Sequence, residues 1–188
     1  MSARRRWTGS QEAVRTAPPA QSKRRLAQLG LAAAVVLVLA VRMVAIEPMR
    51  IDSDSMAPTL SAGEHVVIDK LRYRGSGPQP GELAAFDDPR SDDVMLKRVV
   101  AVSGDVVGLE DGVLVINGRR HAEAYVDRGS VDGVYFGPVT VPPRAVFVLG
   151  DNRGNSVDSR DFGSVSLARL IGPVAARIWP PQRWGTPA

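Results

Sequence analysis

Two kinds of hydrophobic pattern divide the chain. The first is the uncharged run Leu26–Val41, which is apolar on every side. Continued to Ile46, it would be roughly 30 Å long as a helix, which matches the hydrocarbon thickness of a bilayer. A buried helix of a soluble domain would instead carry a single apolar stripe. We therefore predict a transmembrane anchor over residues 26–46.

A cleavable signal peptide is the competing interpretation of this run, because Val38-Leu39-Ala40 has the small residues of a cleavage site. The segment ahead of the run, residues 1–25, is polar, basic and contains proline. Its composition predicts a disordered tail, and its length favours the anchor over a signal peptide.

The second pattern begins after Ile46 and consists of short β-like runs separated by turn residues. It is typical of strands joined by turns, so residues 47–188 are predicted to form one all-β domain of antiparallel sheets. Asp111-Gly112 and Asn117-Gly118 bracket one run, and either suits a tight hairpin. The predicted strands are Ala45–Ile51, His65–Lys70, Glu82–Phe86, Val94–Val102, Val106–Leu109, Val113–Ile116, Ala145–Leu149 and Ala168–Trp179.

The net charge of +4 is distributed unevenly between the tail and the body. Residues 1–25 carry seven bases against one acid, whereas the rest of the chain carries 17 bases against 19 acids. The basic flank predicts a cytoplasmic N-terminus, with the domain after the anchor outside the cytoplasm. Because the body is slightly acidic, no nucleic-acid groove is expected on it.

Cysteine is absent, and histidine occurs only as His65 and His121. The chain therefore has no thiol nucleophile and no disulfide framework. Two histidines without an HExxH spacing argue against a zinc site, so no metal or cofactor is predicted. Each histidine stands in a polar context without a carboxylate at a useful spacing, and both are expected to be solvated or structurally bonded.

Candidate nucleophiles lie in the stretch Ile51–Leu60, which reads Ile-Asp-Ser-Asp-Ser-Met-Ala-Pro-Thr-Leu. If this stretch enters on an extended segment, Ser53 and Ser55 point to the same side. One hydroxyl would then attack a carbonyl while the other stabilises the oxyanion. The same residue types also form ordinary turns, so the stretch alone leaves both interpretations open.

A serine nucleophile needs a base, and lysine is the informative residue type because arginine stays charged in proteins. Of the three lysines, Lys23 belongs to the tail and Lys70 stands in a polar context that suits a solvated role.

The third lysine, Lys97, lies in an apolar run beside Arg98, and one of these two bases must face the inner side of a sheet. Burial favours the neutral amine, so a buried Lys97 next to Ser55 would form a Ser-Lys dyad. An exposed strand charge is the alternative for Lys97.

A polar cluster at Gly150–Gly163 follows a predicted strand. A calcium-binding loop is one interpretation, but the acidic positions do not follow the EF-hand spacing. Together with two earlier stretches, this cluster resembles the signature boxes of bacterial type I signal peptidase, in that family's order and behind an N-terminal anchor. The matching motifs are Ser53-x-Ser55-Met56-x-Pro58-Thr59-Leu60, Leu96-Lys97-Arg98-Val99 through Ser103-Gly104-Asp105, and Gly150-Asp151-Asn152-Arg153-x-Asn155-Ser156-x-Asp158-Ser159-Arg160, with Gly81–Phe86 and Asn117–Tyr125 as weaker matches.

The resemblance implies catalytic roles for three residues. Ser55 would be the nucleophile and Lys97 the general base. Ser53 would donate its hydroxyl to the oxyanion, alongside the backbone N–H of Ser55. Asp52 and Asp54 depart from the Pro and Gly that the family often has at these positions.

The resemblance also implies supporting and substrate-binding residues. Ser156 would orient the lysine, while Asp158 and Arg160 would form a supporting ion pair. The positions that match the lining of small substrate pockets are Ile51, Met56, Leu60, Met95 and Leu96.

The function implied is that of a serine endopeptidase, anchored in the cell membrane by one helix, which removes signal peptides from exported preproteins. It would cleave after a small residue of an Ala-x-Ala-type segment, through an acyl-enzyme and without a cofactor. Its partners would be signal peptides and the lipid bilayer, and its oligomeric state is not predicted. A Ser-Lys peptidase that cleaves itself or one dedicated partner is an alternative, as is an inactive peptide-binding relative. The anchor argues against the first alternative, and the intact serine and lysine argue against the second.

Overall fold

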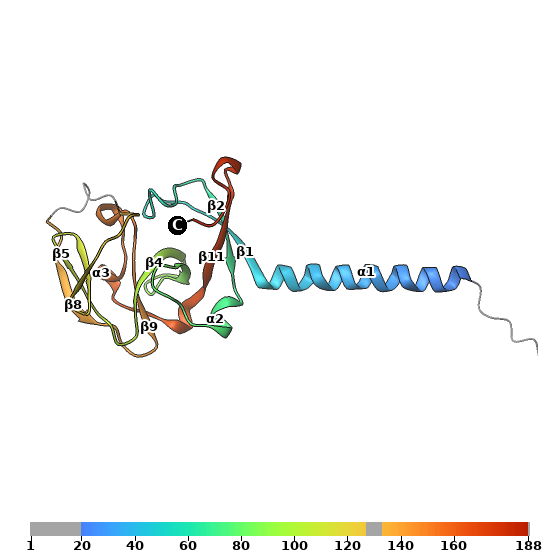
Figure 1. Ribbon diagram of the computed structural model, residues 1–188, viewed down its shortest axis with the longest axis horizontal. Coiled ribbons are helices and arrows are strands. Elements are labelled where there is room, and N and C mark those ends of the chain that lie inside the picture. Colours follow the sequence, from blue (N-terminus) through green and yellow to red (C-terminus); the bar gives the residue numbers. More distant parts are fainter. Residues whose placement is uncertain (1–19, 127–132, 188) are drawn as a thin grey trace, which may run out of the picture. The chain divides into compact units, whose positions relative to one another are not determined.

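The computed structural model describes residues 20–126 and 133–187, so most of the tail predicted for residues 1–25 lies outside the described residues. The chain divides into two compact units after Val41. The uncharged run lies in the helix α1 (Ala20–Ala45), which forms the described part of the first unit up to Val41 (Figure 1). The helix begins six residues before the start of the predicted anchor and ends one residue before the end of the predicted anchor. Its segment Arg24–Val41 is long and apolar enough to cross a membrane, by length and composition, and is exposed throughout.

The second unit is built mainly from two antiparallel sheets, as the pattern of short strands predicted. The large sheet has the strand order β1-β2-β11-β3-β4-β9-β10. Its strands are β1 (Ile46–Arg50), β2 (His65–Asp69), β3 (Leu83–Asp87), β4 (Val94–Val102), β9 (Ala145–Leu149), β10 (Val165–Ser166) and β11 (Leu170–Trp179).

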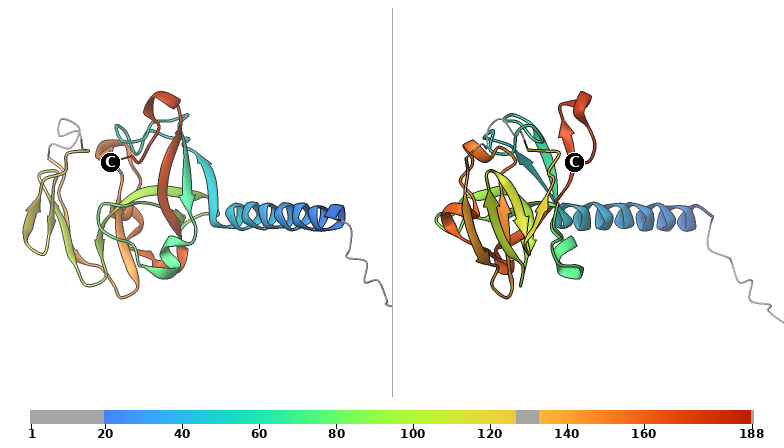
Figure 2. Two further views of the ribbon diagram at one scale, coloured as in Figure 1. Left: turned by 45° about the vertical axis from the view of Figure 1, so that its right-hand side comes forward. Right: turned by 60° about the vertical axis from the view of Figure 1, so that its left-hand side comes forward.

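The small sheet has the order β7-β6-β5-β8 and is formed by β5 (Val106–Glu110), β6 (Val113–Ile116), β7 (Arg119–His121) and β8 (Phe136–Thr140). Both predicted hairpins are present, because Asp111-Gly112 joins β5 to β6 and Asn117-Gly118 joins β6 to β7. All four of these turn residues have positive φ, the conformation that tight hairpins require. The left-hand view of Figure 2 separates the small sheet, in yellow to orange, from the long red strand β11.

Three hydrophobic cores stabilise the second unit. The first, which includes Val107, Leu114 and Phe147, joins the small sheet to β4 and β9. The other two use different side chains of the large sheet's central strands, with Ala85 and Leu96 in one and Ala84 and Val99 in the other. Because side chains alternate along a strand, these two cores lie on opposite faces of the large sheet. Burial on both faces explains why β3 and β9 read as continuous apolar runs.

Several short elements were not predicted. Strands β7, β8 and β10 are only two to five residues long, and β8 contains Gly137 and Pro138. Strand β11 begins two residues later than predicted, because a 3-10 turn, η3 (Leu167–Arg169), precedes it. The other short helices are α2 (Arg72–Gly75), η2 (Arg153–Asn155), α3 (Ser159–Phe162) and η4 (Pro181–Arg183).

Candidate active site

The stretch that holds the candidate nucleophile is a series of turns, so of the two interpretations left open by the sequence the turn is correct and the extended segment is not. Backbone hydrogen bonds from Ala57 to Asp54 and from Leu60 to Met56 close these turns. The turns nevertheless bring the two hydroxyls together, since the Ser53 Oγ donates to the Ser55 Oγ over 3.2 Å. The serines therefore meet through a tight reversal of the chain and not through strand alternation.

The nucleophile loop (residues 51–64) is held by core packing and by hydrogen bonds. Met56 and Leu60 are 1% and 0% exposed and insert into the core of the large sheet. The Asp54 carboxylate accepts a hydrogen bond of 2.9 Å from the Ala62 N–H. The Ser55 carbonyl accepts a hydrogen bond of 3.1 Å from the Asn152 N–H. These contacts fix the backbone on both sides of the Ser55 hydroxyl.

Lys97 projects from β4 towards this loop. Its Nζ is hydrogen-bonded to the Ser55 Oγ over 2.7 Å, and the residue is 3% exposed. The expectation that one of the two adjacent bases faces inward is too narrow, because Arg98 is 4% exposed as well. Because β4 is buried on both faces, the two side chains point to opposite faces of the large sheet and both are buried.

The surroundings of the lysine amine increase the share of its neutral form. Burial lowers the pKa of Lys97 to about 8, and the negative charges of Asp158, Asp151 and Asp88 oppose this shift without cancelling it. Among the described residues, no carboxylate forms a salt bridge with the amine. Desolvation therefore outweighs the nearby acids.

The third polar cluster packs behind the Ser–Lys pair. Asp158 is fully buried and receives two hydrogen bonds of 2.8 Å from the Arg160 guanidinium, which is the ion pair expected from the sequence. The Asp158 carboxylate also accepts from the Gly150 N–H at 3.0 Å. Asp158 caps α3 as well, in a capping box with Asp161. One carboxylate thus ties the end of β9 to the start of α3.

Ser156 lies beside this cluster, but its Oγ is buried and makes no hydrogen bond to any described residue. The hydroxyl closely approaches the position that a Cβ on Gly150 would occupy, and the Ser55 carbonyl approaches it from another side. Any larger residue at position 150 would therefore collide with both serines. The orienting role expected for Ser156 stays a prediction.

A buried ion pair between Arg98 and Asp151 was not singled out from the sequence. Arg98 Nε and Nη2 donate to the two carboxylate oxygens of Asp151 over 2.9 and 2.7 Å. The Thr59 hydroxyl of the nucleophile loop also donates to Asp151. The available signal was two adjacent bases inside an apolar strand, since a buried arginine requires a buried acid.

A cleft of about 260 Å³ opens at the Ser–Lys pair. Ser53, Ser55 and Lys97 line it, together with four of the five predicted substrate-binding residues: Ile51, Met56, Met95 and Leu96. The fifth, Leu60, is fully buried in the core and does not line the cleft. The cleft therefore combines the candidate catalytic groups with apolar side chains.

The remaining candidate bases lie elsewhere. His65 and His121 are both exposed, and Lys70 is half-buried in a salt bridge of 2.9 Å to Glu47. No group of three or more potential metal-ligating side chains occurs among the described residues.

A hydroxyl paired with a buried amine in a cleft defines a candidate serine hydrolase site. Comparison with known proteins is more specific, because residues 24–179 match the family model described as signal peptidase, peptidase S26. The chain belongs to this family, and it is a peptidase.

Individual relatives are similar over most of the chain. The chain is 33% identical to a signal peptidase I of Mycobacterium tuberculosis, in an alignment that covers 94% of this chain and 81% of that protein. It is 35% identical to a probable signal peptidase I-2 of Synechocystis, with 81% and 72% covered. A solved signal peptidase I structure from Enterococcus faecalis is 34% identical, covering 51% of this chain and 95% of that chain with a TM-score of 0.46.

Proposed function

We propose that the chain is a membrane-anchored signal peptidase in which Ser55 is the nucleophile and Lys97 the general base. The observation that carries this proposal is the 2.7 Å contact between the Ser55 Oγ and the Nζ of an amine that is 3% exposed. Membership of the signal peptidase family supplies the substrate class, proteins that bear signal peptides.

The first chemical step is acylation. The Ser55 Oγ attacks the scissile carbonyl carbon while its proton passes to the neutral Lys97 Nζ. The carbonyl oxygen becomes an oxyanion, and collapse of the tetrahedral intermediate breaks the peptide C–N bond. The leaving amine takes the proton from Lys97, so the signal peptide stays on Ser55 as an ester and the mature protein departs.

The lowered pKa makes this step accessible near neutral pH. With the pKa of Lys97 at about 8, roughly a quarter of the amines are neutral at pH 7.5. For an ordinary lysine the neutral fraction is about one in a thousand. The buried position therefore supplies the base that neither exposed histidine offers.

Ser53 would stabilise the oxyanion. Its Oγ lies 3.2 Å from the Ser55 Oγ, so rotation about one side-chain bond redirects the hydroxyl towards an oxygen bound beside Ser55. The second donor is the backbone N–H of Ser55. Removing one such donor from a serine peptidase typically costs about 3 kcal/mol of transition-state stabilisation.

The second chemical step is hydrolysis of the ester. Lys97, neutral again after protonating the leaving amine, accepts a proton from the attacking water. The tetrahedral intermediate then collapses with Ser55 as the leaving group, which regains its proton from Lys97. The signal peptide is released with a free carboxylate, and the enzyme returns to its starting protonation state.

The cleft suits an extended substrate with small side chains. β4 pairs with β9 only from Arg98 onwards, so among the described strands its segment Val94–Lys97 has one unpaired edge at the cleft. A signal peptide adding a strand there would direct alternate side chains into the cleft. The small volume of about 260 Å³, lined by Met56 and Met95, favours alanine-sized residues in an Ala-x-Ala pattern.

Helix α1 would place the enzyme at its substrate. Its apolar segment Arg24–Val41 would span the cell membrane once, with the basic tail in the cytoplasm and the catalytic domain outside. Signal peptides are themselves held in the bilayer, so a shared membrane raises the effective concentration of the cleavage site.

The proposal is tested with the full chain purified in detergent and a preprotein whose signal peptide ends in Ala-x-Ala. Cleavage should occur after the second alanine, and a serine-reactive acylating probe should label Ser55. The Ser55→Ala variant should lose both cleavage and labelling. The Ser91→Ala variant, which changes an exposed serine, should retain both. Cleavage that survives in Ser55→Ala would overturn the proposal.

A further inference from the structure

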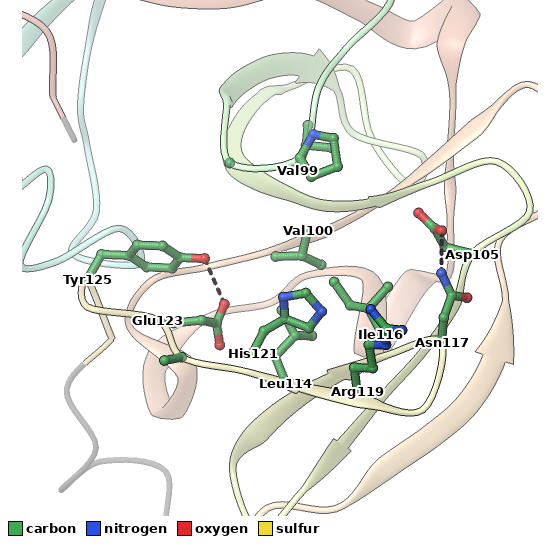
Figure 3. Close-up of a pocket in the computed structure, with 13 residues that line it drawn as sticks. Val99, Val100, Asp105, Leu114, Ile116, Asn117, Arg119, His121, Glu123 and Tyr125 are labelled. Carbon is green, nitrogen blue, oxygen red and sulfur yellow. Dashed lines mark hydrogen bonds between the residues drawn. The ribbon is translucent and has the colours of Figure 1, made fainter.

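The segment Ala122–Tyr125, which we call the strap, follows β7 of the small sheet and lies outside the catalytic cleft. Two of its side chains, Glu123 and Tyr125, turn the same way and are joined by a hydrogen bond of 2.8 Å from the Tyr125 hydroxyl (Figure 3). On one side they line a cavity of about 700 Å³ between the sheets. On the other side they meet two arginines that the mechanism does not use.

Glu123 is the acid that neutralises Arg153. The two form a salt bridge in which the side chains are 7% and 1% exposed. Arg153 also donates from Nε to the Gly150 carbonyl over 3.0 Å, while its Nη1 makes no hydrogen bond within the described residues. Without Glu123, the guanidinium would be buried with no acid bound to it. Such a group moves towards water when its partner is removed, because an uncompensated buried charge is costly.

Tyr125 covers the other arginine. Its ring lies 3.8 Å from the Arg98 guanidinium carbon, which is a cation–π contact in a site shielded from water. Burial raises the pKa of Tyr125, and the charge of Glu123 raises it further. The phenol therefore keeps its proton and remains the donor to Glu123. One short segment thus holds both guanidinium groups.

Both arginines connect directly to the loops that form the site. Arg98 holds Asp151, which accepts a hydrogen bond from Thr59 four residues after Ser55. Arg153 holds the carbonyl of Gly150, the residue at which an added Cβ would collide with the Ser55 carbonyl. A shift of either guanidinium would therefore be transmitted to the backbone around the Ser55 hydroxyl.

We propose that Glu123 and Tyr125 are positioning residues for the catalytic centre, through which the small sheet holds Arg98 and Arg153 against the nucleophile loop. The proposal rests on the proposed Ser55–Lys97 mechanism. Neither residue lines the cleft at Ser55, so neither is expected to bind substrate. Their effect should therefore appear in kcat and not in KM, since a small misplacement of a reacting group can cost about 100-fold in rate.

Two strap variants test this proposal in the full-length detergent-solubilised enzyme. Tyr125→Leu removes the ring over Arg98, and Glu123→Gln removes the negative charge beside Arg153 while keeping the side-chain shape. Each has a matched control in the small sheet. Phe136→Leu removes an aromatic ring whose centroid lies 5.5 Å from that of Phe147. Glu110→Gln breaks a surface salt bridge to Arg120.

The measurements are kcat and KM for preprotein cleavage, the rate of Ser55 acylation by the probe, and Tm. Both strap variants should lower kcat and the acylation rate, by up to about 100-fold, with KM within about twofold of the original. The controls should keep kcat, although Phe136→Leu is expected to lower Tm as much as Tyr125→Leu does. Adding Arg153→Met to Glu123→Gln should recover part of the lost Tm, because it removes the unpaired charge, but should not recover kcat, because the contact to the Gly150 carbonyl is lost as well.

Two results would overturn the proposal. One is unchanged kcat in both strap variants while the original enzyme acylates normally. The other is a loss of kcat that merely follows Tm, equal in Tyr125→Leu and Phe136→Leu. Failure of the original enzyme to acylate at Ser55 would instead remove the Ser55–Lys97 mechanism on which the proposal rests, so the two failures are distinguishable.

Discussion

Lys97 and Arg98 are neighbours on β4 and both are almost completely buried, yet the groups that contact them on the two faces of the strand differ. Arg98 meets a carboxylate with two hydrogen bonds, a threonine hydroxyl and an aromatic ring. Lys97 meets a serine hydroxyl, and no described carboxylate forms a salt bridge with it. The face of Arg98 therefore stabilises a charge, whereas the face of Lys97 disfavours one.

The difference shows that burial alone does not set the charge of a base. Arginine is too basic to lose its proton in a protein, so it can be buried only with an acid such as Asp151. Lysine yields its proton more readily when water is removed and no acid is bound to it. The lysine and the arginine at these two positions are therefore not interchangeable, because each residue type suits only one of the two faces.

The largest effect is expected from placing a permanent charge on the lysine face. Lys97→Arg keeps a base at the position but removes the one that can be deprotonated. Cleavage of a preprotein should fall by at least about 10⁴-fold, similar to the loss of a catalytic residue in other serine peptidases. Single-turnover acylation of Ser55 provides the measurement.

The converse exchange, Arg98→Lys, is the control for Lys97→Arg. It retains a positive charge opposite Asp151 and should leave measurable cleavage. Near-normal activity in Lys97→Arg would contradict the assignment of Lys97 as the base.

The second largest effect is expected from removing the acid on the arginine face. Asp151→Asn leaves Arg98 buried with its charge uncompensated, which typically destabilises a protein by about 3–5 kcal/mol. The loss should appear as a lower denaturant midpoint with an unchanged m-value.

The double variant Arg98→Met/Asp151→Asn removes the buried charge as well and should recover part of this stability. The surface pair offers a second reference, because Glu110→Gln should change stability by less than about 1 kcal/mol. Equal effects of Asp151→Asn and Glu110→Gln would show that the buried pair is not special.

Strand β4 also shows how much of the fold and of the candidate site the sequence predicts. The apolar run of β4 predicted a strand with correct bounds. Three motifs in order pointed to Ser55 and Lys97, which line one cleft, and to Asp158 and Arg160, which form an ion pair. These motifs are local, so their spacing carries the information.

The sequence did not reveal which acid serves Arg98, since Asp151 lies 53 positions away and meets it only through the sheet register. The residue types of the nucleophile stretch allowed turns, but the sequence did not reveal that these turns bring Ser53 to Ser55. Those turns are closed by hydrogen bonds that Asp54 and Met56 accept from other residues of the loop. Such contacts leave no periodic pattern in the sequence.

A third prediction concerns stability on the lysine face. Below pH 8 the folded protein must bury a charged amine that water would solvate in the unfolded chain. With the pKa of Lys97 lowered from 10.5 to about 8, this costs roughly 3 kcal/mol. Lys97→Met should therefore inactivate the enzyme while raising its unfolding free energy by up to this amount at pH 7, as measured by urea unfolding.

The sign follows from proton binding, because between pH 8 and 10.5 the unfolded chain holds the proton that the folded protein has lost. The cost at Lys97 thus shrinks as pH rises, and the advantage of Lys97→Met should disappear above about pH 10.5. Lys70→Met, at a half-exposed lysine paired with Glu47, is the control and should not stabilise the protein. A Lys97→Met variant that is less stable than the original at pH 7 would contradict a desolvated amine.

The smallest effect separates the two faces by pH. In the proposed mechanism Lys97 acts in its neutral form, so kcat/KM should rise about tenfold per pH unit up to pH 8 and then level off. Arginine side chains do not titrate in this range in proteins, so the pH profile reports on the lysine face alone. Asp88, which lines the cleft, raises the pKa of Lys97 by its charge, so Asp88→Asn should move the midpoint of the rise to lower pH. A midpoint near 10, or one that moves upward in Asp88→Asn, would mean that the amine is solvated during catalysis and that the two faces of β4 do not differ as the structure indicates.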